Sequence, residues 1–257
     1  DAVYDALVSV EKLSLITEAD IEQSGSQPLP VKNEGVVIAF QDVSFAYADN
    51  DPVLQHISFS IDAGQMVQLK GVSGAGKSTV LRLLTGAFTH YTGNILLEQI
   101  PIGNYQVDSL RNSTGILLGS QDIFQGTLLE NLTMGNQAVD LESVARMAAI
   151  TGLNSFVQSC KNGFDTVLMP GGNKLSSNVR KNILLIRALV GEHRLLLLEE
   201  PFKHLEHPFK ANVIDYIKND KTATVIITSA DEGLEQYCDK IIRMSKNGEI
   251  ITDIQNG

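Results

Sequence analysis

The stretch at residues 71–79, GVSGAGKST, combines residue types at the spacing needed to hold a chain of phosphates. Its three glycines let the backbone curl so that successive N–H groups point inward at phosphate oxygens. Lys77 can place its charge on the β- and γ-phosphates, and the hydroxyl of Ser78 can ligate Mg²⁺. The motif therefore predicts a site for a nucleoside triphosphate with Mg²⁺, built from Ser73, Gly74, Ala75, Gly76, Lys77, Ser78 and Thr79.

A second candidate is the stretch LLLLEE at 195–200, an apolar run that ends in two acids. Beside a phosphate loop, one acid can hold the Mg²⁺ shell and the next can polarise the attacking water. This interpretation makes Glu199 a metal residue and Glu200 the general base. The alternative is a buried structural strand that ends in polar residues, and the presence of the phosphate loop disfavours this interpretation.

The surrounding elements are those that such a site needs. The strand-like stretch MVQLK at 66–70 precedes the loop, and the helical stretch STVLRLLTG at 78–86 follows it and ends at a glycine. Strands that alternate with helices predict an α/β domain with a largely parallel sheet. Between about 125 and 190 the pattern is helical and indicates an insertion. Further strand-like stretches lie at 36–40, 43–47, 57–61, 94–98, 115–119, 222–228 and 239–245, and a helical one at 209–219.

The stretch at 171–189, GGNKLSSNVRKNILLIRAL, changes from a loop into a helix with one apolar face. Ser176 or Ser177 is a candidate N-cap, because a hydroxyl there accepts a bond from an unpaired backbone N–H. A helix start also suits an anion, since its free N–H groups and dipole are positive. An ordinary capped helix remains the simpler interpretation of this stretch by itself.

Composition limits the classes of protein that fit. The chain has 257 residues, 43% hydrophobic and 19% charged, which is typical of a globular domain with a sizeable core. A formal net charge of −10 argues against bulk binding to nucleic acid or to an anionic lipid surface. The two cysteines, Cys160 and Cys238, have no metal-ligand or redox spacing, so reduced thiols are expected. No apolar run approaches the ~20 residues that span a bilayer.

Taken together, the motifs resemble the ATP-binding cassette of ABC transporters in their order and approximate spacing. The resemblance covers residues from about 35 to the C-terminus. It includes FAYADNDPVL with Tyr47, the phosphate loop, GSQDIFQGTLLENL with Gln121, the Leu175–Ser176 pair and the two glutamates. The segment GFDTVLMPGGNKLS resembles the exporter-type approach to the family signature.

The resemblance implies roles for the remaining residues. Tyr47 would stack on the adenine of ATP. Gln121 would meet Mg²⁺ together with Ser78 and Glu199, and would relay the nucleotide state to membrane helices. Ser176 would touch the γ-phosphate held by the opposite cassette. Each residue also has an ordinary structural reading: an aromatic on a strand, a loop residue and a helix cap.

Several positions depart from the family pattern. The usual Leu-Ser-Gly-Gly-Gln signature continues after Leu175 and Ser176 with Ser177, Asn178 and Val179, so side chains stand where backbone should approach a phosphate. The magnesium-site aspartate is Glu199, and the usual Ser-Ala-Leu-Asp is KHLE at 203–206. Ala230 occupies the place of the switch histidine, and its methyl group cannot hydrogen-bond a phosphate.

The expected fold is therefore a P-loop α/β core of ABC type with an antiparallel β portion and a helical subdomain at about 120–188. We expect residues 1–34 to be the end of a membrane-proximal helix, with a stripe at 1–17, plus a linker at 18–34, and residues 35–257 to be the nucleotide-binding domain. Because the chain opens with Asp, it suggests a fragment of a longer exporter. The expected partners are a transmembrane domain of the same polypeptide and a second cassette, identical or not, but no nucleic acid. The expected place is the cytoplasmic face of the cell (inner) membrane.

Three functions compete at this point: an ATPase that drives export, a degenerate cassette that binds ATP with little hydrolysis and has a regulatory role, and a soluble non-transport ABC ATPase. The acidic balance and the exporter-like leader disfavour the third, and Glu200 favours slow hydrolysis over none. The sequence HLEH at 204–207 also suggests zinc, but it lacks two further ligands. We therefore expect His204 and His207 to be surface histidines.

Overall fold

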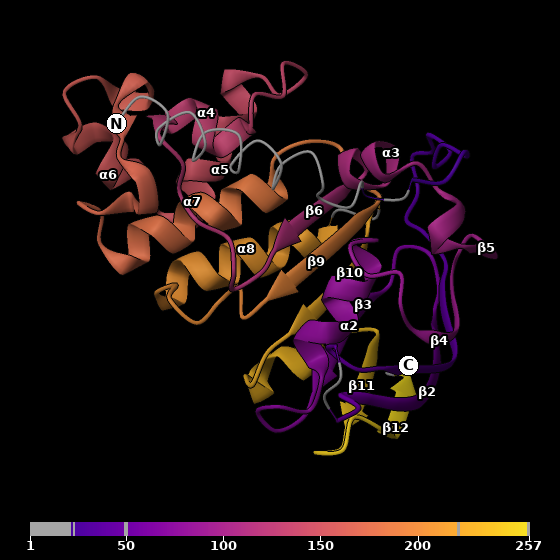
Figure 1. Cartoon of the computed structure of the whole chain (residues 1–257). Helices are drawn as coiled ribbons and strands as arrows, with labels where there is room; N and C mark the ends of the chain where they lie inside the picture. The colour runs from indigo at the N-terminus through magenta and orange to yellow at the C-terminus, as the bar shows by residue number, and fades with distance from the viewer. Residues whose placement is uncertain (1–21, 23, 49–50, 220–221, 256–257) are drawn as a thin grey trace, which may run out of the picture.

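The computed structural model describes residues 22, 24–48, 51–219 and 222–255, so the predicted helix at 1–17 lies outside the described residues. Figure 1 shows a central sheet whose strands run in the order β12-β11-β3-β10-β9-β6. Neighbouring strands from β11 to β6 are parallel, and β12 pairs antiparallel at one edge. The strands are β3 (Met66–Lys70), β6 (Thr114–Leu117), β9 (Leu195–Glu199), β10 (Thr224–Thr228), β11 (Lys240–Met244) and β12 (Ile250–Gln255).

A second, antiparallel sheet has the order β2-β1-β4-β5. Helix α2 (Lys77–Leu84) packs with both sheets in one apolar core, which contains Leu81 and Leu84 of the helix, Phe40 of the antiparallel sheet and Leu69 of the central sheet. This packing fixes the direction of the helix that follows the phosphate loop. The antiparallel strands are β1 (Ile38–Phe45), β2 (Leu54–Ile61), β4 (Thr92–Leu97) and β5 (Ile100–Pro101).

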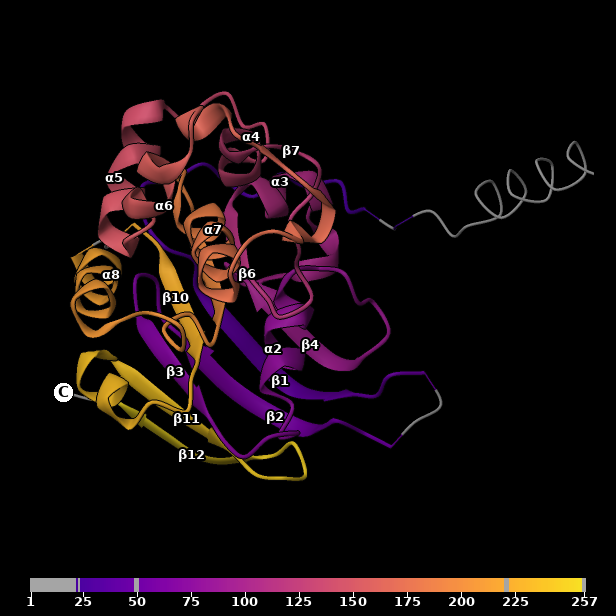
Figure 2. The same ribbon diagram turned by 90° about the vertical axis from the view of Figure 1, so that its left-hand side faces the viewer.

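The helical region covers the other face of the central sheet and extends away from it. In both views α4, α5 and α6 lie at the opposite end of the molecule from β2 and β12 (Figures 1 and 2). None of the helices in the described ranges is long and apolar enough to cross a membrane. The helices are α3 (Val107–Asn112), α4 (Leu128–Thr133), α5 (Leu141–Thr151), α6 (Asn154–Ser159), α7 (Ser177–Leu189) and α8 (His207–Asn219), with a short pair of strands, β7 (Gly126–Thr127) and β8 (Val167–Leu168).

The four leucines of β9 show why an uninterrupted apolar run forms this strand. Leu195 and Leu197 belong to the core around α2, whereas Leu196 and Leu198 belong to the core beneath α5, α7 and α8. A strand covered on both faces needs apolar side chains at every position, because its side chains alternate between the faces. The polar Glu199 follows at the carboxyl end, the edge where ligands bind in sheets of this kind.

These elements confirm the predicted α/β class with an antiparallel portion and an inserted helical region. Strand 66–70 was predicted at its observed bounds, and Ser176 is the N-cap of α7. The two stretches at 36–40 and 43–47 form one strand, β1, whose pairing with β2 shifts register twice. We did not predict β12, because its residues are mostly exposed and lack an apolar alternation. Pro208 lies in the first turn of α8, where proline is tolerated.

Part of the predicted linker packs against the domain. Leu29 is buried, and backbone groups of residues 25–27 bond those of residues 104–106. The guanidinium of Arg194, itself buried, donates to the carbonyl oxygens of Pro30, Glu34 and Gly35 at 2.8–2.9 Å. It also pairs with Glu98 at 2.9 Å. Arg194 therefore ties this segment to the central sheet. The division of the chain at residue 34 stays a prediction.

Candidate functional site

The loop between β3 and α2 has the backbone of a phosphate cradle. Gly74 and Gly76 have φ angles of +83° and +84°, a region that L side chains rarely adopt. A Cβ on Gly76 would come within 2.5 Å of Leu54, whereas a Cβ on Gly74 would meet nothing within 4 Å. Gly76 is the N-cap of α2 and offers no side-chain cap. The first N–H groups of α2 therefore suit an anion.

This loop forms one wall of a cavity of about 440 Å³, which we call the phosphate cavity. The opposite wall comes from the carboxyl ends of β9 and β10, which are adjacent and in register at Glu199 and Thr228. The sheet thus brings the two sequence motifs together across more than 100 residues. The cavity is lined by Val53, Gly71, Ser73, Gly74, Ala75, Gly76, Lys77, Ser78, Thr79, Glu199, Glu200, Lys203, Thr228 and Ala230.

Ser78 and Glu199 are in direct contact. The Ser78 hydroxyl donates a short hydrogen bond to one oxygen of the Glu199 carboxylate, and the N–H of Gly119 donates to the other at 2.8 Å. A hydroxyl beside a carboxylate is a donor set that suits Mg²⁺, which prefers oxygen ligands and is usually held by one or two carboxylates plus substrate phosphates. Although glutamate replaces the usual aspartate, the longer side chain still reaches Ser78.

Lys77 lies at the start of α2, and its ammonium group donates to the carbonyl oxygens of Gly71 and Val72, both at 2.8 Å. Partial burial lowers the pKa of Lys77, and the negative charges of Glu200 and Glu199 oppose that shift. The side chain thus follows the loop and keeps its charge in the phosphate cavity. A cation held along the carbonyls of the phosphate loop is well placed for phosphate oxygens.

Glu200 occupies an unusual backbone conformation, with a φ of +47°. Its N–H donates to the carbonyl of Thr228 at 2.8 Å, which turns the chain at the end of β9. Residues other than glycine adopt this conformation at a cost of about 1–3 kcal/mol. The turn leaves the Glu200 side chain on the wall of the phosphate cavity. A carboxylate there can accept a proton from a water molecule.

Gln121 lies in a neighbouring cavity, also of about 440 Å³, which we call the second cavity. Its Oε1 accepts a hydrogen bond from the N–H of Leu118 at 3.1 Å, so the side chain folds back on its own loop. Glu199, Glu200 and Lys203 line both cavities and separate them. The structure thus places Gln121 next to the acidic residues and outside the lining of the phosphate cavity.

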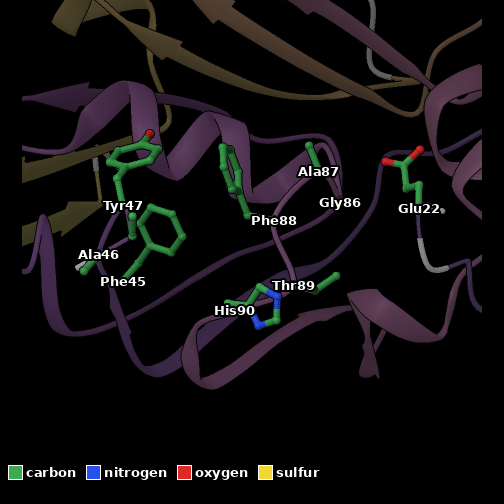
Figure 3. Close-up of a pocket in the computed structure, with 10 residues that line it drawn as sticks. Glu22, Phe45, Ala46, Tyr47, Gly86, Ala87, Phe88, Thr89 and His90 are labelled. Carbon is green, nitrogen blue, oxygen red and sulfur yellow. The ribbon is translucent and has the colours of Figure 1, made fainter. Parts of the chain in front are cut away.

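Tyr47 reaches the first turn of α2. Its hydroxyl hydrogen-bonds Thr79 Oγ1 at 3.1 Å and accepts from Arg82 at 3.3 Å. The ring packs edge-on against Phe45 and Phe88, with centroids 4.8 and 5.6 Å away. Figure 3 shows these rings at one end of a cavity of about 490 Å³. The Tyr47 ring is therefore next to the phosphate loop, because Thr79, which bonds the Tyr47 hydroxyl, also lines the phosphate cavity.

Ser176 uses its hydroxyl as the helix cap: Oγ accepts from the N–H of Val179 at 3.3 Å. Ser176 does not line the phosphate cavity, whereas Ser177 lines the second cavity. Among the predicted site residues, the structure thus brings together 73–79, Glu199 and Glu200. It places Tyr47 and Gln121 beside them and Ser176 apart from the phosphate loop of the same chain.

Sequence reasoning missed Gln68, a fully buried residue of β3. Its Nε2 donates to the carbonyl oxygens of Ser229 and Asp231, both at 3.1 Å, and so fixes the loop on either side of Ala230. The Asp231 carboxylate in turn pairs with Lys210 of α8. A glutamine in the otherwise apolar part of MVQLK was the available signal, because a buried amide needs partners.

His204 is partly buried, which corrects the prediction of a surface histidine. Its Nε2 lies 2.8 Å from Oδ1 of Asn182, and burial together with the charge of Lys181 lowers the pKa of His204 to about 4. His204 belongs to the loop before α8, and this contact joins that loop to α7. In the described part of the chain, no three His, Cys, Asp or Glu side chains form a group that could hold a metal ion.

Comparisons with known proteins agree with this geometry. A sequence profile described as "ABC transporter" matches residues 54–203. The uncharacterized ABC transporter ATP-binding protein YfiC of Bacillus subtilis is 31% identical over 252 residues, which cover 98% of this chain and 40% of the relative. An ATP-dependent lipid A-core flippase of Idiomarina loihiensis is 32% identical over 217 residues, covering 83% of this chain and 37% of the relative.

A solved structure, that of a bacterial Atm1-family ABC exporter with ATP bound, matches with a TM-score of 0.86 and 25% identity. The match covers 98% of this chain and 44% of that chain. The chain therefore spans less than half the length of these two relatives and of the solved exporter. The expected P-loop core of ABC type is confirmed by this match and by the sequence profile.

Proposed function

The chain belongs to the ABC transporter family of ATP-binding domains, and from that premise we propose that it binds Mg-ATP, hydrolyses it slowly and powers or regulates export by a membrane transporter. The observation that carries the proposal is the phosphate cavity. There a glycine-rich loop and Lys77 face Glu199 and Glu200 across one cavity of about 440 Å³. This arrangement supports the proposal that one chain supplies the phosphate cradle, the oxygen pair for Mg²⁺ and the candidate base.

Each side chain has a distinct task in this proposal. Backbone N–H groups at the start of α2 and the Lys77 ammonium bind the phosphate chain. Ser78 and Glu199 would hold Mg²⁺, which would supply positive charge to the phosphates, and Gln121 would be a further ligand. Glu200 accepts the proton of the attacking water. Tyr47 provides an aromatic face for adenine.

We propose slow hydrolysis because two sets of groups that the family uses at the γ-phosphate are replaced in this chain. Ala230 lines the phosphate cavity with a methyl group, which cannot donate a hydrogen bond. At the start of α7, Ser177 and Asn178 stand where the family has glycines. Losing one preorganised donor at a reacting centre costs about 10²–10³ in rate. Because Glu200 remains on the cavity wall, we propose slow turnover rather than none.

The partners and the location are part of the proposal. Ser176 lies apart from the phosphate loop of its own chain, which supports its use on nucleotide held by a second cassette. The relatives include a probable multidrug resistance ABC transporter ATP-binding/permease protein of Bacillus subtilis, which supports a transmembrane partner and a place at the cytoplasmic face of the membrane. The division of the chain into 1–34 and 35–257 is proposed from the sequence alone. A second candidate, a regulatory cassette with essentially no hydrolysis, is favoured by Ala230 and the changed start of α7.

Nucleotide titration tests the proposal. Wild type should bind Mg-ATP with a dissociation constant in the micromolar to millimolar range, about −4 to −8 kcal/mol. Lys77→Ala should remove most of that affinity, because it deletes the ammonium group that is proposed to bind the phosphates. Lys181→Ala is the matched control, since Lys181 is exposed and lines only the second cavity. Equal ATP affinity in wild type and Lys77→Ala would overturn the assignment.

A further inference from the structure

We propose that Lys203 is a second γ-phosphate cation, which takes over the contact that Ala230 cannot make and gives the site its preference for ATP over ADP. The inference rests on the proposed function, since it assumes that the phosphate cavity holds ATP. It adds a specificity residue that the phosphate-loop motif does not contain.

The backbone around Lys203 holds it at the cavity. Glu200 turns the chain through its bond to Thr228, and the N–H of Lys203 donates to the carbonyl of Glu200 at 3.4 Å. Phe202, only 4% exposed, anchors the turn in the core beneath α7 and α8. Lys203 itself is exposed and lines both the phosphate cavity and the second cavity. The backbone position of Lys203 is thus set by the turn at Glu200 and by the buried side chain of Phe202.

The ammonium group of Lys203 is available to bind a phosphate. Within the described ranges it makes no hydrogen bond and no ion pair, whereas Lys70, Lys210 and Lys240 are paired with Glu235, Asp231 and Asp253. Lysine carries three donors on a flexible four-carbon stem. It can therefore turn toward a phosphate without giving up an existing partner.

The charges of the phosphate cavity favour this role. Its lining contains two cations, Lys77 and Lys203, and two anions, Glu199 and Glu200. Without Lys203, the charged side chains of the lining would be one cation and two anions, so Lys203 adds to the positive charge that Mg²⁺ would supply. The γ-phosphate is the part of ATP that ADP lacks, and it adds negative charge and acceptor oxygens. A second cation near that end favours the triphosphate over the diphosphate.

The position of Lys203 allows it to replace a contact that Ala230 cannot make. Both residues follow the carboxyl ends of adjacent parallel strands, Lys203 after β9 and Ala230 after β10, and both line the same cavity. Gln68 fixes the loop around Ala230, so that loop cannot easily bring another polar side chain inward. Lys203 is the cation that follows the neighbouring strand, β9, at this cavity.

The test compares nucleotides on the intact protein. We would titrate wild type, Lys203→Met and Lys203→Arg with Mg²⁺ and either ADP or β,γ-methylene ATP, which is not hydrolysed. Lys203→Met should reduce the preference for the triphosphate about 3–10-fold, mainly by weakening triphosphate binding. Lys203→Arg should keep the preference within about twofold, because it retains the charge and the donors. Lys181→Met, which removes an exposed lysine from the second cavity only, should leave the preference unchanged.

An unchanged preference in Lys203→Met would overturn the inference. So would faster ATP hydrolysis in Lys203→Met with an unchanged preference, since that result assigns Lys203 to restraining Glu200. Lys77→Ala separates the two proposals. If Lys77→Ala loses nucleotide while Lys203→Met keeps the wild-type preference, the proposed function stands and the inference fails. If wild type binds neither nucleotide, both fail.

Discussion

Two helix starts, those of α2 and α7, meet the same physical problem in different ways. At α2 the N-cap is Gly76, which has no side chain, so the first N–H groups suit a ligand. At α7 the N-cap is Ser176, whose hydroxyl accepts from the N–H of Val179. A helix start attracts anions through the same groups that a capping side chain satisfies.

The difference between the two helix starts supports the proposal that α2 serves nucleotide binding within one chain, whereas the start of α7 does not contribute to the same cavity. Around α2, loop, cation, hydroxyl and two carboxylates line one cavity. Around α7, Ser177 and Asn178 add side chains where an anion would need close backbone contact. We therefore expect that changes near α2 alter binding strongly, and that changes near α7 and Ala230 alter mainly the rate of hydrolysis.

The largest expected effect concerns Glu200, because a positioned general base contributes about 10²–10⁴ in rate. Glu200→Gln should lower ATP turnover by that order while leaving Mg-ATP affinity within a few-fold of wild type. Steady-state phosphate release and nucleotide titration on one preparation measure both quantities. A turnover rate that Glu200→Gln leaves untouched would mean that the activity does not belong to this site.

Tyr47 should have the next largest effect, and it extends the comparison to the adenine end of the site. Base–aromatic stacking is worth about 1–3 kcal/mol, so Tyr47→Ala should weaken ATP binding about 5–150-fold. Tyr47→Phe keeps the ring and loses only the hydroxyl bonded to Thr79, so its affinity should be nearly that of wild type. If both variants bind ATP like wild type, adenine lies elsewhere.

Gly74 tests whether the open space at the α2 start is used by phosphate. Gly74→Ala places a methyl group in the cradle and should weaken ATP binding about tenfold. Gly135 is the matched control, since its φ is +73° and a Cβ there would also meet nothing within 4 Å. Both variants should lose about 1 kcal/mol of unfolding free energy, because both force a side chain into a left-handed conformation. Equal ATP affinities in the two variants would show that phosphate does not use the space beside Gly74.

The smallest expected effect is on the pH dependence of stability, and it concerns His204, which contacts Asn182 of α7. Because the pKa of His204 is about 4 in the fold and about 6.5 when unfolded, the unfolded chain binds a proton first as the pH falls. The stability that neutral His204 supports is present above pH 6.5 and is lost as the pH falls toward 4. After discounting for partial exposure, we expect a loss of about 1 kcal/mol.

His204→Gln should flatten this pH dependence, measured as the denaturation midpoint at pH 7 and pH 4.5. His207→Gln, a change at an exposed position, should leave the pH dependence as in wild type. A pH dependence that survives His204→Gln at full size would assign the effect to other groups.

Much of the fold could be predicted because its signals are local. The residues at 66–70 predict their own strand, and the serine before α7 predicts the start of that helix, without information from the rest of the chain. Arg194 and Gln68 could not be assigned, because their partners are backbone carbonyls of distant segments that only the fold brings near. The burial of His204 was missed for the same reason, since its partner Asn182 lies on α7, more than 20 residues away in the sequence. Tertiary contacts decide the burial of a polar residue, and the surrounding sequence does not record them.

The central claim is that ATP binding is intact here whereas the groups that speed hydrolysis are reduced. The most direct test is the ATP turnover of the intact protein with Ala230→His, Ser177→Gly and Asn178→Gly combined, compared with wild type. The account predicts at least a tenfold rise in ATP turnover, with Mg-ATP affinity changed by less than about threefold. Wild type that already hydrolyses ATP as fast as the restored variant would contradict the account.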